Sequence, residues 1–124
     1  MIGSTRSVRV FAWRRPVDMR RGFDGLYALV LEELQHDPLS GDIFVFVSRD
    51  RRRAKALMWD GTGLCLFSKR LERGRFVRLA NGENLSQLQL TVTELQLLLE
   101  GSHAVGKLPL SPAIFDTSSL ASIR

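Results

Sequence analysis

Apolar side chains recur at helical spacing in the first third of the chain. Successive steps of four, three, four and four residues connect Met19, Phe23, Leu26, Val30 and Leu34. This spacing is typical of one face of an amphipathic helix. Because Asp18 stands directly before the run and can act as an N-cap, the pattern predicts one long N-terminal helix.

Strand-like segments lie on both sides of this helix. Residues 7–11 and 54–59 alternate between apolar and polar side chains, whereas residues 42–48 are β-branched and aromatic without alternation. An unbroken run of this kind predicts a central strand that is covered on both faces. Residues 64–69 are expected to pair with 54–59 through an Asp-Gly turn, and residues 75–79 to add the next strand.

A second helix signal follows later in the chain. Thr91 and Glu94 have the spacing of a capping box, in which each residue bonds the other's backbone amide. Leu95 and Leu98 then give a buried face, and Gly101 ends the element. These residues predict a short C-terminal helix.

Together these segments predict an α+β fold. We expect a mostly antiparallel sheet of four to five strands, with the long N-terminal helix on one face and the short C-terminal helix closing it. A chain of 124 residues has the length of one domain. Residues 1–101 are therefore predicted to form a single α+β domain, and residues 102–124, rich in Ser and Pro, a poorly ordered tail.

Composition narrows the environment of the protein. The longest apolar runs, residues 26–31 and 43–47, are far shorter than the roughly 20 residues of a membrane-spanning helix. We therefore expect no membrane partner and a cytoplasmic, nucleoid-associated protein. The single cysteine, Cys65, cannot form an intrachain disulfide and is expected to be a small core residue of its strand.

Positive charge is concentrated in the first two thirds of the chain. The formal net charge is +5, and residues 1–80 hold 16 of the 18 Lys and Arg against nine of the 13 Asp and Glu. Arginine outnumbers lysine, which favours forked contacts to phosphate or carboxylate. A solvated surface would also explain the high pI, but the uneven spread favours a polyanionic partner.

Two clusters of cations are candidates for contacts with DNA phosphates, which set affinity without reading sequence. The first is a turn between predicted strands and comprises Arg49, Arg51, Arg52, Arg53 and Lys55. The second follows the hairpin and comprises Lys69, Arg70, Arg73 and Arg75. The alternatives are a merely solvated turn for the first cluster and an ion pair with Glu72 for the second.

A third candidate anion site is formed by Arg20 and Arg21. Both lie in the first turn of the predicted helix, where cations oppose the helix dipole. An anion held at the helix N-terminus would resolve this conflict. Pairing with Asp18 or Asp24 is the alternative that needs no ligand.

The sequence gives little support for catalysis. His36 and His103 lie in predicted loops, without the spacing of a metal site, and no glycine-rich phosphate loop follows a strand. We therefore predict no catalytic residues, no metal site and no cofactor. The aromatic residues of the strands are expected in the core, with Trp59 the strongest candidate for stacking on a base because it shares a strand face with Lys55.

Three sequence blocks resemble a known family. Residues 18–26 read DMRRGFDGL, residues 55–76 read KALMWDGTGLCLFSKRLERGRF, and residues 90–101 read LTVTELQLLLEG. In order and spacing they resemble the TnpB accessory proteins (Orf2-like) of the insertion-sequence-66 family of bacterial transposons. The resemblance implies a small helper protein encoded beside a transposase and needed for efficient transposition.

The function expected from residues and resemblance together is a non-enzymatic accessory factor for DNA transposition. Its expected partners are DNA near a transposon end, bound through the phosphate backbone, and the cognate transposase; self-association is left open. One alternative is a pure protein-interaction module that binds the transposase without touching DNA. The other is a metal-dependent nuclease that would use Asp18, Asp42, Asp60 or Glu72.

Overall fold

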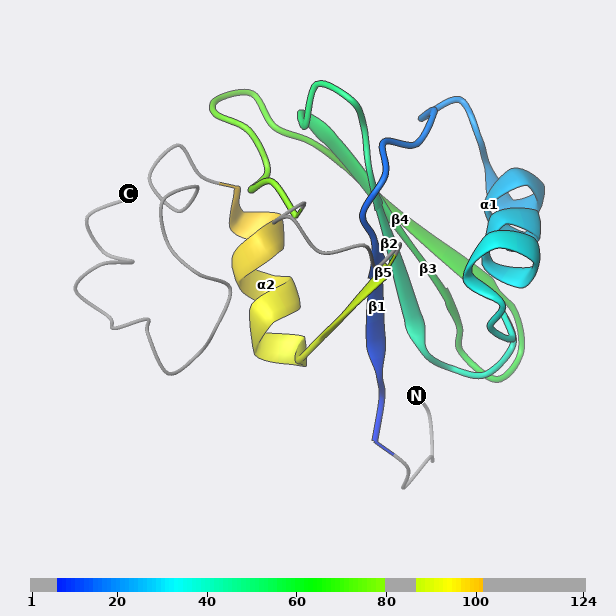
Figure 1. Ribbon diagram of the computed structural model, residues 1–124. Helices are drawn as coiled ribbons and strands as arrows, with labels where there is room; N and C mark the ends of the chain where they lie inside the picture. Colours follow the sequence, from blue (N-terminus) through cyan, green and yellow to red (C-terminus); the bar gives the residue numbers. More distant parts are fainter. Residues whose placement is uncertain (1–6, 80–86, 102–124) are drawn as a thin grey trace.

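The computed structural model describes residues 7–79 and 87–101, and these form one five-stranded sheet with helices on both faces (Figure 1). The predicted tail at residues 102–124 lies outside the described residues. The strands are β1 (Val10–Trp13), β2 (Ile43–Val47), β3 (Arg53–Trp59), β4 (Leu64–Arg70) and β5 (Gln87–Leu90). The helices are α1 (Phe23–Leu29), the π-helical turn η1 (Val30–Leu34) that continues it, and α2 (Val92–Glu100).

The sheet is mixed, with the strand order β4-β3-β2-β1-β5. β1 and β2 are parallel, and Val10 lies beside Ile43. The other three pairs are antiparallel. The parallel pair arises because the chain leaves β1, crosses one face of the sheet through α1 and η1, and returns to β2 in the same direction. An α+β architecture is therefore present, but the sheet contains a parallel pair.

The prediction of one long N-terminal helix is wrong. The helix begins only at Phe23, and Gly22 before it has an extended backbone without a side-chain cap. Asp18 does not cap a helix, because its carboxylate accepts hydrogen bonds from the backbone N and the side chain of Arg20. These contacts close a separate turn, in which the N–H of Arg21 also donates to the carbonyl of Asp18 at 3.1 Å. Hydrophobic periodicity alone did not reveal this break.

Each face of the sheet is covered by its own apolar layer. On one face, α1 and η1 contribute Leu26, Val30 and Leu34, which pack on Phe11, Trp13, Phe44, Phe46 and Leu57. On the other face, α2 and the segment 71–79 cover alternate residues of the same strands. Figure 1 shows α1 and α2 on opposite sides of the sheet. Residues 44–47 are buried throughout, so the predicted central strand is confirmed.

Two other predictions about the strands need correction. Residues 75–79 form no strand, and the edge strand beyond β1 is β5. Phe76 is fully buried and Val77 and Leu79 nearly so, which means that the segment packs over the sheet rather than joining it. Cys65 is exposed on the edge strand β4 instead of lying in the core.

An ion pair between a buried carboxylate and a half-exposed arginine joins the beginnings of the two parallel strands. Asp42 has no exposed surface, and its carboxylate accepts hydrogen bonds from the backbone N of Arg9 at 3.1 Å and from the Arg9 guanidinium at 2.9 Å. Burial acts to raise the pKa of Asp42, but the bonds from Arg9 and from the Ser40 hydroxyl outweigh it, and the net pKa is lowered. The carboxylate is therefore charged at neutral pH and fixes the parallel pairing.

The C-terminal helix forms as predicted. The Thr91 hydroxyl accepts from the backbone N of Glu94 at 3.0 Å, and the Glu94 carboxylate accepts from the backbone N of Thr91 at 2.8 Å. Such caps contribute about 1 kcal/mol to stability. Gly101 follows with a φ of 72°, and a Cβ there would lie 2.6 Å from Leu71. The position therefore requires glycine both for its backbone conformation and for the close approach of segment 71–79.

Candidate nucleic-acid interface

The turn between β2 and β3 is held in one conformation by short hydrogen bonds. The Arg51 N–H donates to the carbonyl of Ser48 at 3.0 Å. The Asp50 carboxylate accepts from the Ser48 hydroxyl at 2.6 Å and from the backbone N of Arg52 at 3.0 Å. These two bonds, that from Ser48 foremost, lower the pKa of Asp50. Asp50 is thereby committed to shaping the turn.

Arg51 occupies an unfavourable backbone conformation within this turn. Its φ is 60°, in the left-handed region that glycine adopts most easily. For other residues this conformation costs about 1–2 kcal/mol. A charged, bulky side chain at such a position suggests a use for that side chain, since strained residues cluster at functional sites.

The segment 71–79 runs beside the turn and is bonded to it along its length. The Leu71 N–H donates to the carbonyl of Arg52 at 2.8 Å, and the Phe76 N–H donates to the carbonyl of Arg51 at 2.7 Å. The Arg51 guanidinium donates in return to the carbonyl of Phe76 at 3.2 Å. Arg75 donates to the carbonyl of Asp50 at 3.1 Å. Two stretches far apart in sequence thus bring their arginines together.

A cleft opens where this segment meets the carboxyl ends of the parallel strands β1 and β2. Its volume is about 150 Å³. The Val17 N–H donates to the carbonyl of Val47 at 3.0 Å and holds the chain leaving β1 against the end of β2. The cleft, called the arginine cleft below, is lined by Trp13, Arg14, Arg15, Pro16, Val47, Ser48, Arg49, Arg51, Val77, Arg78 and Leu79.

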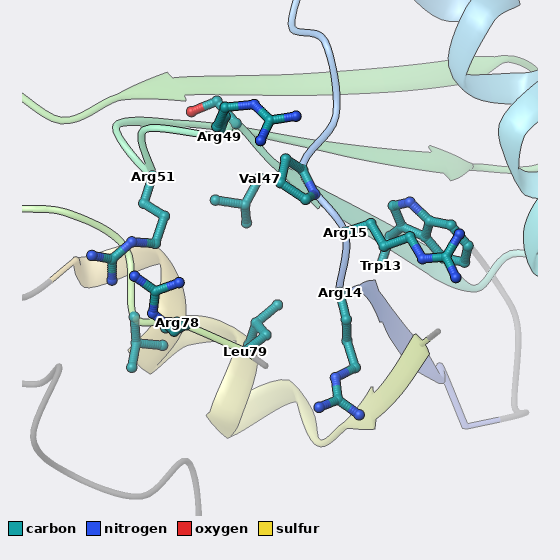
Figure 2. Close-up of a pocket in the computed structure, with 11 residues that line it drawn as sticks. Trp13, Arg14, Arg15, Val47, Arg49, Arg51, Arg78 and Leu79 are labelled. Carbon is teal, nitrogen blue, oxygen red and sulfur yellow. The ribbon is translucent and has the colours of Figure 1, made fainter. Parts of the chain in front are cut away.

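The arginine cleft has an apolar floor and a cationic rim. Figure 2 shows Val47 and Leu79 around its centre, Arg51 and Arg78 together on one side, and Arg14 and Arg15 on the opposite side. The residues of its lining include five arginines and no carboxylate. Burial lowers the pKa of Arg51, and the positive charges of Arg78 and then Arg75 lower it further. Closely spaced like charges of this kind favour an anion between them.

The predicted cations do not all belong to this cleft. Arg49 and Arg51 line it, while Arg52, Arg73 and Arg75 are exposed residues of the turn and of segment 71–79. Arg53, Lys55, Lys69 and Arg70 border a second, shallower depression of about 560 Å³. Met19, Ser68 and Glu72 complete its lining.

Three of the four cations that border the second depression bond other groups of the protein through their side chains. Lys55 donates to the carbonyls of Met19 at 2.9 Å and Arg21 at 2.8 Å, and so holds the turn before α1. Lys69 donates to the carbonyl of Leu99 near the end of α2 at 2.7 Å. Arg70 pairs with Glu72 at 3.1 Å, as the structural alternative for this cluster predicts. Glu72 also adds a carboxylate to this lining, whereas the lining of the arginine cleft contains none.

Arg20 and Arg21 lie before α1, so the expected conflict with the helix dipole does not arise. Arg20 pairs with Asp18 at 2.6 Å, and its side chain is 91% exposed. Hydrogen bonds from Arg20 lower the pKa of Asp18 to about 2. Arg21 donates to the carbonyl of Gly25 at 3.3 Å. Of the two possibilities that the sequence left open for Arg20, the structure shows the ion pair with Asp18.

Sequence reasoning missed Arg14, Arg15 and Arg78 as site residues. Arg14 and Arg15 lie outside every element predicted from the sequence, and Arg78 belongs to the predicted strand 75–79, which does not form. A signal was available for the first two, because they stand at the end of an apolar strand together with an aromatic residue. The Arg15 guanidinium lies 5.8 Å from the centre of the Trp13 ring, within the range of a cation–π contact.

The described part of the chain contains no helix long and apolar enough to cross a membrane. Within the same residues, no three His, Cys, Asp or Glu side chains come together in a way that could hold a metal ion.

Comparison with known proteins gives one family and two relatives. A family model described as "IS66 Orf2 like protein" matches residues 8–107. "Uncharacterized protein y4jC" and "Uncharacterized protein y4hO", both of Sinorhizobium fredii (strain NBRC 101917 / NGR234), are each 47% identical to the chain over 77 residues. The matched region is 62% of this chain and spans 66% and 67% of these two relatives. No solved structure was found to match the chain.

Proposed function

Since this chain belongs to the IS66 Orf2-like family, whose members are accessory proteins associated with transposition, we propose that it is a non-catalytic helper that contacts DNA. In this proposal the arginine cleft and the exposed arginines beside it bind the phosphate backbone near a transposon end. The cognate transposase binds a different surface.

The observation that carries the proposal is the convergence of Arg51, Arg75 and Arg78 beside the cleft. Burial lowers the pKa of Arg51, and the positive charges of Arg78 and Arg75 lower it further, so each of these two arginines repels Arg51. A phosphate between them would relieve this repulsion and accept forked hydrogen bonds. Contacts of this kind fix the position of DNA without reading its sequence.

The first prediction concerns salt. If five phosphates are bound, each adds about 0.9 to the slope of log affinity against log salt, so affinity falls several-hundred-fold between about 50 and 200 mM salt. Fluorescence anisotropy with a labelled duplex measures this slope. An affinity that does not change with salt would rule out the phosphate contacts.

A second surface suits the transposase. α1 and η1 expose Phe23 (47%) and Leu31 (51%), on the face of the molecule that also carries Asp24, Glu32 and Glu33. Exposed apolar side chains surrounded by polar ones are a feature of many protein interaction sites. We place the transposase contact here, away from the arginine cleft.

The second prediction follows from this placement. The transposase should co-purify with the protein after nuclease treatment, and the double variant Phe23→Ser, Leu31→Ser should lose it. The matched control is Phe67→Ser, Val92→Ser, which removes side chains of similar exposure (49% and 46%) from β4 and α2. Loss of the complex on nuclease treatment would contradict direct contact.

Charge reversal separates this function from a pure interaction module. The test changes Arg51, Arg52 and Arg53 to Glu. If the variant no longer binds the transposase but still binds DNA, these arginines contact the protein partner. The opposite result supports the DNA contact. For the nuclease alternative, cleavage of labelled DNA with Mg²⁺ or Mn²⁺ that Asp60→Ala abolishes would be needed.

A further inference from the structure

We propose that the arginine cleft binds a single unpaired nucleotide, with the base on its apolar floor and the phosphate on its rim. The inference rests on the proposed DNA contact and deepens it, because it names the form of DNA that the cleft takes. An ordinary duplex presents only phosphates and sugars to such a site, and its bases remain stacked.

The size of the cleft is the first reason. A cavity of about 150 Å³ has the volume that accommodates one six-membered aromatic ring. Phosphate contacts with a smooth duplex need surface cations and no hollow behind them. A hollow of the size of one ring, directly between cations, fits a ligand that has both an aromatic ring and a phosphate.

The floor of the cleft is the second reason. Val47 and Val77 are each 7% exposed and Leu79 is 8% exposed, so the exposed edge of the core forms the base of the hollow. Contact between the apolar floor of the cleft and water is unfavourable, whereas contact between this floor and the flat face of a base is favourable. Bound sulfate or phosphate alone would leave this surface in water.

The rim supplies the polar contacts. Arg51 and Arg78 lie together on one side, where their charges favour a phosphate (Figure 2). Across the cleft, Arg15 is positioned against the Trp13 ring. Arginine planes, like aromatic rings, stack on unpaired bases.

This arrangement selects DNA whose bases are already free. Pulling a base out of a duplex requires breaking its pairing and stacking, so the same cleft binds a single-stranded overhang or a frayed end more tightly. Such ends arise wherever a transposon is cut from or joined to DNA. The protein would thus recognise the state of the DNA end and not its sequence.

The test compares three labelled DNAs with the same duplex: blunt, with a three-nucleotide overhang, and with the same overhang lacking its bases. We expect the normal overhang to bind at least about fivefold more tightly than the blunt duplex, in line with one stacked base. The abasic overhang should bind like the blunt duplex. Equal binding of normal and abasic overhangs would overturn the proposal, because only extra phosphates would then be detected.

Equal, salt-dependent binding of all three DNAs would also overturn it, while leaving the contact with duplex backbone intact. If none of the three DNAs binds, the proposed function itself is overturned. Leu79→Trp fills the hollow and should abolish the preference for the overhang. Leu39→Trp, at the opposite end of β2 and 42% exposed, is the matched control and should keep it. Should Leu79→Trp fail to fold by circular dichroism, the abasic comparison still decides.

Discussion

The double variant Arg51→Ala, Arg78→Ala should lose about 1.8 from its salt slope, because two of five phosphate contacts are removed. The loss of affinity between about 50 and 200 mM salt would then fall from several-hundred-fold to roughly 40-fold. Affinity at any fixed low salt should be lower as well. Anisotropy titrations at four or five salt concentrations measure both quantities.

Arg20→Ala is the control for this prediction. It removes the same side chain from an exposed site, but Arg20 is already paired with Asp18 and lies before α1, away from the cleft. Its salt slope should equal that of the unaltered protein. If Arg20→Ala lowers the slope by half as much as the double variant, each lost charge has the same effect, and the arginine cleft has no special part in binding.

Phe76→Ala should lower the free energy of unfolding by about 3–5 kcal/mol, the range for removing a buried phenylalanine. Phe76 belongs to segment 71–79, which has neither helix nor strand, and its side chain is fully buried. Its side chain, together with the backbone bonds to Arg51, holds segment 71–79 over the sheet. Because domains of this size are stable by only about 5–15 kcal/mol, the loss would be a large fraction of the total.

Chemical denaturation followed by circular dichroism measures the effect. The matched control is Phe67→Ala on β4, where the ring is 49% exposed and its removal should cost far less. Similar losses for both variants would show that segment 71–79 contributes little to the fold. The position of Arg78 beside Arg51 would then lack its structural support.

The elements that could be predicted from sequence are those fixed by local chemistry. In the β3–β4 hairpin, the Asp60 carboxylate accepts from the backbone N of Thr62 and of Gly63, both at 2.9 Å, and Trp59 lies opposite Leu64 as expected. The Thr91–Glu94 capping box is local in the same sense. In both cases the hydrogen bonds join residues no more than three positions apart, so the local sequence is enough to predict them.

The errors arose where a distant part of the chain decides the outcome. Residues 75–79 have the composition of a strand, yet Phe76 is bonded to Arg51 and buried against the sheet, which leaves no edge for pairing. In the N-terminal helix, Asp18 bonds Arg20, and Lys55 from β3 holds the carbonyls of Met19 and Arg21. The helical spacing of apolar residues does not reveal a hydrogen bond from a lysine that lies 34 residues away in the sequence.

The candidate site was found only in part for a similar reason. The density of charge along the chain identified Arg49 and Arg51. Arg14 and Arg15 form only a pair, and they join the cleft because β1 and β2 are parallel and end side by side. Arg78 stands alone between apolar residues and joins the cleft through segment 71–79. The predicted sheet was mostly antiparallel, and the prediction did not specify this one parallel pair.

The exposed thiol on β4 gives the protein a ready attachment point for a reporter group. Cys65 is the only cysteine in the chain, and it lies on an edge strand at a distance along the sheet from the arginine cleft. Incomplete solvation of the exposed thiol, together with the hydrogen bond to Asp60 and the negative charge of Asp60, raises the pKa of Cys65. Coupling to a maleimide dye will therefore be slow at neutral pH and faster in mildly alkaline buffer. A fluorophore placed there would report on the approach of a labelled DNA end by energy transfer, without any change to the native sequence.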